Sequence, residues 1–122
     1  MKPTTLNLEA SKAIHELGVE VESEKWWSDE LIMQGIAKEW VIVTSKAYDK
    51  AQYIPAPNLQ ELFLALPEIG EKLGWDEREE LRDPMFNEIR NYKYYSLILT
   101  DTYLESGMEG VSKQVIELLS SN

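Results

Sequence analysis

The fold is decided by residues 53–67, which read YIPAPNLQELFLALP. The prolines at its start hold the chain extended, because proline fixes one backbone angle and lacks an N–H group. Asn58 can then cap a helix, and Glu61, three residues later, can reach back to complete a capping box. Apolar residues recur at helical spacing and predict one buried face: Leu59, Leu62, Phe63 and Leu66. We expect Pro67 to interrupt this helix, with a further turn or two reaching Gly74.

The preceding half of the chain shows both helical and strand patterns. An apolar stripe over residues 6–17 predicts a helix, which Gly18 ends. Residues 19–27 begin with strict alternation and predict a strand with one solvated face. Residues 28–37 are ambiguous and can form a short helical turn. Residues 40–44 are β-branched and apolar, which predicts a strand buried on both faces.

After the central helix, residues 92–100 are rich in tyrosine and aliphatic residues and predict a second buried strand. Ser106 and Glu109 form a capping-box pattern that opens a final helix. Its apolar stripe comprises Met108, Val111, Val115, Leu118 and Leu119. Residues 76–90 suit an exposed helix or a long loop, and Pro84 breaks any single helix there.

These elements predict a small α+β fold. Two strands that are apolar on both faces indicate a sheet covered on both sides, and three amphipathic helices are available to cover it. The element order contains one hairpin and no series of crossover units. We therefore expect a mainly antiparallel sheet with helices on both faces, an α/β/α sandwich.

Length and composition point to one domain. The 122 residues include no cysteine, which excludes disulfides and thiol catalysis. We find no repeat and no linker, so residues 1–122 are expected to form a single domain. No apolar run approaches the roughly 18 residues that span a bilayer, and residues 1–7 lack the apolar core of a signal peptide. We expect a cytoplasmic protein.

The charge of the chain limits its partners. Acidic residues number 22 against 12 basic ones, for a formal net charge of −10. A field of this sign repels nucleic acid and anionic membranes, so we expect neither as a direct partner. It suits a basic protein partner or the imitation of DNA.

The arrangement resembles small uncharacterised phage and prophage proteins of the α/β/α sandwich type. The resemblance is carried by the helix ending at Leu17-Gly18, the tryptophan-bearing strand at 39–43, the segment 53–62 followed by Leu66-Pro67, and the tyrosine-rich segment 92–100 before the last helix. It implies a phage-type accessory protein in the host cytoplasm. It implies no activity, cofactor or catalytic residue.

No pattern of catalytic residues is visible. His15 is the only histidine, and it lies between Ile14 and Leu17 without a nucleophile motif beside it. One histidine and no cysteine do not supply the ligands of a zinc site. The glycines do not form a phosphate loop, since the lysine and hydroxyl of that motif are missing. We therefore expect no enzyme, no metal and no cofactor.

Two groups of residues are candidates for contact with a partner. Trp26 and Trp27 are adjacent at a predicted strand end, where one ring can stay exposed as an anchor, although core packing explains aromatic residues as well. An acidic run forms the second group, and such runs are usually solvated surface. The candidate contact residues are Trp26, Trp27, Asp76, Glu77, Glu79 and Glu80.

Two functional hypotheses follow. The first is a non-enzymatic accessory protein that acts by binding another protein. The second is an acidic, DNA-mimicking inhibitor of a host defence or DNA-binding protein, which the net charge of −10 favours. A true mimic would carry its acidic residues on one surface with few lysines among them.

Overall fold

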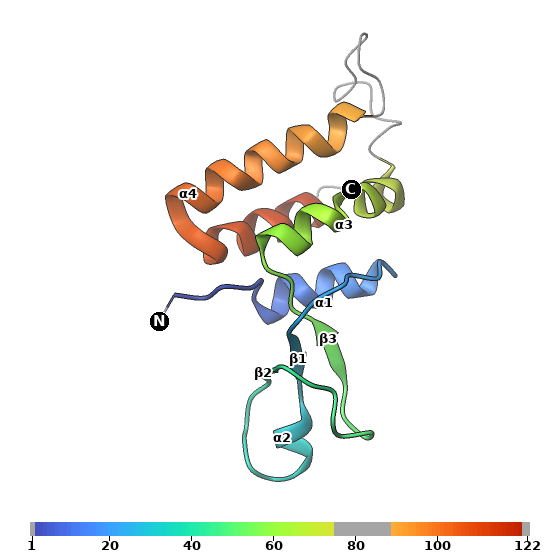
Figure 1. Ribbon diagram of the computed structural model, residues 1–122, viewed down its shortest axis with the longest axis vertical. Coiled ribbons are helices and arrows are strands. Elements are labelled where there is room, and N and C mark those ends of the chain that lie inside the picture. Colours follow the sequence, from blue (N-terminus) through green and yellow to red (C-terminus); the bar gives the residue numbers. More distant parts are fainter. Residues whose placement is uncertain (1, 75–88, 121–122) are drawn as a thin grey trace.

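The computed structural model describes residues 2–74 and 89–120, and it has the expected α+β class (Figure 1). Four helices and three strands occur in these ranges. Their bounds are α1 Leu8–Glu16, β1 Trp26–Ser28, α2 Glu30–Met33, β2 Val41–Val43, β3 Tyr53–Pro55, α3 Leu59–Leu73 and α4 Ile89–Ser120. The charged segment for which we predicted a helix or a loop, residues 76–90, lies almost wholly outside the described residues.

The central helix begins as predicted. Asn58 Oδ1 accepts a hydrogen bond from the Glu61 N–H at 2.8 Å, and Glu61 Oε1 accepts one from the Asn58 N–H at 2.9 Å, which completes the capping box. The expected interruption at Pro67 is wrong, because α3 runs through it to Leu73. A proline inside a helix loses one backbone hydrogen bond, at about 3 kcal/mol. Burial of Ile69 and Leu73 beyond it offsets that loss.

The core lies between the long helices. Both α1 and α3 pack against α4, and the side chains of Leu6, Leu62, Leu99 and Val111 are completely buried. The predicted burial of Leu62 and Leu66 is confirmed. Phe63 is only partly buried against this cluster, because it lies at the edge of the helical face.

The strand predicted at residues 92–100 is wrong: this segment is the first half of α4. Burial of Tyr95 and Leu99, four residues apart, follows a helical period, whereas Leu97 between them is 66% exposed. Thr100, the one threonine of this segment, is accommodated by a hydrogen bond to the preceding turn. Thr100 Oγ1 donates to the Ser96 carbonyl at 2.7 Å.

A kink divides α4 into two halves. Gly107 has φ 66° and ψ −161°, a conformation that essentially only glycine adopts. Figure 1 shows the second half folded back beside the first. Met108, Val111 and Val115 are buried there, which confirms the predicted final helix and its stripe.

The sheet is small and antiparallel, in the order β2-β1-β3. Trp27 on the central strand pairs with Ile42 on one side and Ile54 on the other. The strand predicted from residue 19 begins only at Trp26, and residues 19–25 precede the sheet. The helical turn considered for residues 28–37 is present as α2.

The helices are arranged differently from the expected sandwich. The prediction that β2 is buried on both faces is wrong, because Ile42 is 41% exposed and Val41 and Val43 are only half-buried. Figure 1 shows the three long helices gathered at one end of the sheet, where α1 contacts β3. Strands of three residues offer too little surface to separate two helical layers. The long helices bury their apolar faces mainly on one another.

Ser112 ties the start of the chain to α4. Its Oγ accepts the Asn7 N–H at 3.0 Å and donates to the Met108 carbonyl at 2.8 Å. Ser112→Ala is expected to lower the free energy of unfolding by about 1 kcal/mol, since the Asn7 donor loses its partner. The matched control is Ser11→Ala, because the equally buried Ser11 Oγ has no hydrogen-bond partner among the described residues. Urea unfolding should show a loss for the first variant alone; equal losses would contradict the assignment.

Candidate functional site

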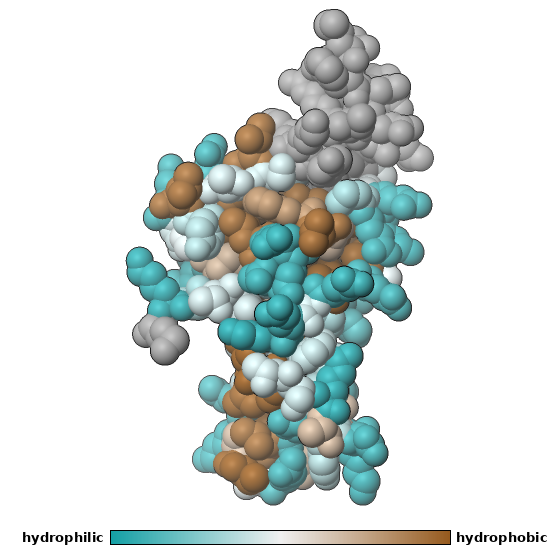
Figure 2. Space-filling model, viewed as in Figure 1, coloured by the Kyte–Doolittle hydropathy of each residue, from teal (hydrophilic) through white to brown (hydrophobic). Residues whose placement is uncertain are grey.

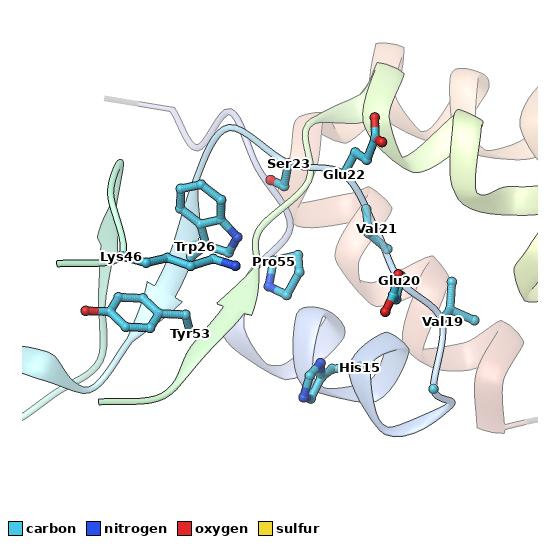
Figure 3. A pocket seen from close by; sticks show the side chains of 11 residues that line it. His15, Val19, Glu20, Val21, Glu22, Ser23, Trp26, Lys46, Tyr53 and Pro55 are labelled. Atoms are coloured by element: carbon cyan, nitrogen blue, oxygen red, sulfur yellow. The ribbon is translucent and has the colours of Figure 1, made fainter. Parts of the chain in front are cut away.

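An open groove of about 600 Å³ lies between the sheet and the segment that follows α1 (Figure 3). One wall comes from the sheet and the loop before β3. The other comes from the end of α1 and the extended chain after it. The lining residues on the sheet side are Trp26, Lys46, Tyr53 and Pro55, and on the opposite side they are His15 and Gly18 to Ser23.

Strand alternation places Trp26 in this groove. Its cross-strand neighbours are Val43 and Pro55, so its ring lies on the same face of the sheet as theirs. Lys46 Nζ lies 5.0 Å from the centroid of the Trp26 ring, within the range of a cation–π interaction. The half-buried indole and this ammonium together form an aromatic, cationic wall.

Tyr53 supports that wall through its hydroxyl group. The hydroxyl donates to Glu30 Oε2 at 2.7 Å and accepts the Tyr48 N–H at 2.8 Å. Desolvation raises the pKa of Tyr53 above its ordinary value, and the bond to the Glu30 carboxylate raises it further. The phenol therefore stays protonated at neutral pH. It links α2 to the chain near Lys46 and acts as a structural tie.

The opposite wall is an extended chain that runs from Val19 to Glu22. Gly18, with φ 81°, turns the chain out of α1. Val19 is buried and Val21 packs against the core, whereas Glu20 and Glu22 are exposed. Figure 3 shows this wall facing Trp26 and Lys46 across the groove. The groove thus has carboxylates on one side and an ammonium on the other.

Hydrogen bonds fix the position of this wall where it approaches β1. Ser23 Oγ donates to the Lys25 carbonyl at 2.8 Å, and the Glu24 N–H donates to Glu61 Oε2 at 3.0 Å. Glu61 belongs to the capping box of α3, so the start of that helix also holds the groove in shape. This wall is therefore held in place by hydrogen bonds within the chain itself.

The groove offers contacts for binding. His15 is exposed at the last turn of α1 and lines one end of it. Within residues 2–74 and 89–120, no group of three or more histidine, aspartate or glutamate side chains is arranged to hold a metal ion. The chemical features of the groove are an aromatic face, one ammonium group and two exposed carboxylates.

The structure separates the candidate contact residues. Trp26 lines the groove, but Trp27 points to the other face of the sheet, where its Nε1 donates to the Leu6 carbonyl at 3.0 Å. Trp27 lines a second hollow of about 500 Å³ together with Ile42 and residues of α4. The other candidates, Asp76, Glu77, Glu79 and Glu80, lie outside the described residues.

Sequence reasoning missed Lys46, Glu20 and Glu22 as site residues. The alternation at residues 19–22 was a usable signal, since it places both glutamates on one solvated face. Lys46 carries no comparable signal. It belongs to the loop between β2 and β3, and the fold brings its Nζ to 5.0 Å from the centroid of the Trp26 ring.

Comparison with known proteins yields no match. No protein-family model matches the chain, and no curated protein or solved structure matches it significantly. In the described part of the chain, no helix is both long enough and apolar enough to cross a membrane.

Proposed function

We propose that this chain is a non-enzymatic protein-binding module that holds its partner in the groove beside Trp26. The observation that carries the proposal is the half-buried indole of Trp26, backed by Lys46 and set in a groove whose opposite wall is held by hydrogen bonds. Tryptophan in such a position is a frequent binding anchor. When a partner binds, the ring buries a large apolar area, and the side chain loses little conformational entropy because it is already held in place. A role as a phage or prophage accessory protein stays a prediction from the sequence resemblance.

The charges of the groove favour a protein over a nucleic acid. Glu20 and Glu22 repel phosphate groups, and the chain carries a net charge of −10. A polypeptide can present a basic side chain to the glutamates and an apolar one to Trp26. Such a polypeptide contacts both walls of the groove.

The alternative, an acidic mimic of DNA, rests on the net charge of −10. The groove mixes Lys46 with the two glutamates, and Lys25 lines the hollow on the opposite face of the sheet. A DNA mimic needs a surface on which carboxylates are not interrupted by lysines. The mixed charge favours the first hypothesis.

Trp26→Ala is expected to reduce retention of the partner at least tenfold, which corresponds to about 1.4 kcal/mol. The measurement is affinity capture from the source cell with quantitative mass spectrometry, followed by titration of the recovered partner. The matched control is Ile36→Ala, which removes a 69% exposed side chain away from the groove. Circular dichroism establishes that both variants are folded.

Two results would count against this assignment. One is a set of recovered proteins that Trp26→Ala leaves unchanged. The other is an equal loss for Trp26→Ala and Ile36→Ala. Lys46→Ala serves as a second groove variant if Trp26→Ala unfolds, because Lys46 is exposed.

A further inference from the structure

We infer that Val19 to Glu22 forms a docking edge, to which the partner adds an extended, basic segment as a β-strand. The inference rests on the proposed function, because it assigns the chemistry of the partner that the groove holds. It is carried by the backbone of this wall, by the charges on it and by the prolines opposite.

The backbone of Val19 to Glu22 has no hydrogen-bond partner among the described residues. The last backbone hydrogen bond before this segment joins the Gly18 N–H to the His15 carbonyl, and the bonds that hold the chain resume only at Ser23. Val19 is nevertheless only 4% exposed. Backbone N–H and C=O groups in such a place are normally paired, so four consecutive unpaired residues form a template for another strand.

The neighbouring chain does not complete this pairing. A slit of about 10 Å³ beside Val19 and Val21 is also lined by Pro55 and Pro57. Neither has a backbone N–H to donate to the carbonyls of the wall. The slit holds at most about one water molecule, so a polypeptide can approach only from the open groove.

The alternation of the wall sets the chemistry of the added strand. Val19 and Val21 point inward to the core, while Glu20 and Glu22 are exposed on the other side. Residues directly opposite in a strand pair lie about 5 Å apart, and opposite charges stabilise such pairs. The added strand therefore carries Lys or Arg facing the glutamates, and apolar residues on its other face, toward Pro55 and Trp26.

The same charges disfavour a second copy of this chain as the occupant. Pairing of two copies along this edge would bring Glu20 and Glu22 of each chain together. Like charges across a strand pair are destabilising. The net charge of −10 adds long-range repulsion between copies and attraction for a basic partner.

The test uses the full chain and synthetic hexapeptides. The probe alternates lysine and valine; one control alternates glutamate and valine, and another is the lysine peptide with alternate backbone nitrogens methylated to remove hydrogen-bond donors on one edge. Amide NMR and hydrogen exchange report on residues 19–22. We expect the lysine peptide to shift these amides and to slow exchange at alternate positions at least tenfold. The acidic and methylated peptides should bind at least tenfold more weakly.

Substitution of the glutamates completes the test. Glu20→Lys combined with Glu22→Lys should reverse the preference, so that the acidic peptide binds better than the basic one. Strand addition is refuted if the lysine peptide leaves residues 19–22 unprotected, or if the methylated peptide binds equally well. Concentration-dependent protection of these amides without peptide would identify a second copy as the occupant and also overturn the inference.

The partner itself separates the two proposals. If its capture needs Trp26 but survives the double glutamate substitution with residues 19–22 unprotected, the groove is the binding site and strand addition is wrong. If its capture needs neither Trp26 nor the glutamates, the proposed function fails as well.

Discussion

Replacing Leu62 by alanine is expected to lower the free energy of unfolding by about 3–5 kcal/mol. The Leu62 side chain is completely buried on α3 and belongs to the core cluster that also contains residues of α1 and α4. It borders a void of only about 10 Å³, together with Leu66, Ile69, Leu99, Val115, Leu118 and Leu119. Because the surrounding helices are held on several sides, they cannot move far enough to fill the cavity left by Leu62→Ala. The expected loss in the free energy of unfolding therefore lies in the upper part of the range for replacing leucine by alanine.

Leu64 provides a matched control on the same helix. Its side chain is 76% exposed, so Leu64→Ala should change the stability by less than about 0.5 kcal/mol. Phe63→Ala should fall between the two, because Phe63 is only partly buried. Urea unfolding followed by tryptophan fluorescence measures all three. Similar losses for Leu62→Ala and Leu64→Ala would show that α3 is rotated from the orientation described.

Replacing Gly110 by alanine is expected to destabilise the protein by about 2–3 kcal/mol, although alanine is the better helix former. A Cβ at Gly110 would lie 2.5 Å from the Ser106 Cβ and 3.1 Å from Thr102 Cγ2. The kink at Gly107 brings these turns together where α4 reverses. The added methyl group must therefore open the kink or displace the second half of α4.

A double substitution tests this cause directly. Ser106→Gly removes the atom with which the new methyl group collides, so it should recover part of the stability lost in Gly110→Ala. The recovery is partial because the Thr102 contact remains. A thermodynamic cycle over the two single variants and the double variant measures the coupling. Strict additivity would mean that Gly110 is needed for some reason other than this contact.

Sequence reasoning succeeded where the determining interactions are local. The capping box of α3 joins Asn58 and Glu61, three residues apart, and the buried stripe after Gly107 repeats within single helical turns. Such contacts are present in any window of about ten residues. They are therefore readable without knowledge of the remaining chain.

The prediction from sequence failed at residues 92–100, where the local preference for a strand and the tertiary packing disagree. Tyrosine, isoleucine and threonine favour a strand, and a short apolar run has no periodicity that separates a strand from a buried helix. Burial of Tyr95 and Leu99 against the other helices selects the helix. Because this segment is a helix and not a strand, the expected sandwich does not form.

The sequence by itself determined the α+β class, the start of α3, the final helix and the candidacy of Trp26, because each depends on neighbours in the chain. Only the tertiary structure decided the groove. Its walls join residues from 15 to 55, and Trp26 faces it while Trp27 does not because of the register of β1 between β2 and β3. A shift of one residue in that register would exchange the two rings between the faces of the sheet. Strand register depends on which strands pair and on the turns that join them, and residues 26 and 27 by themselves specify neither.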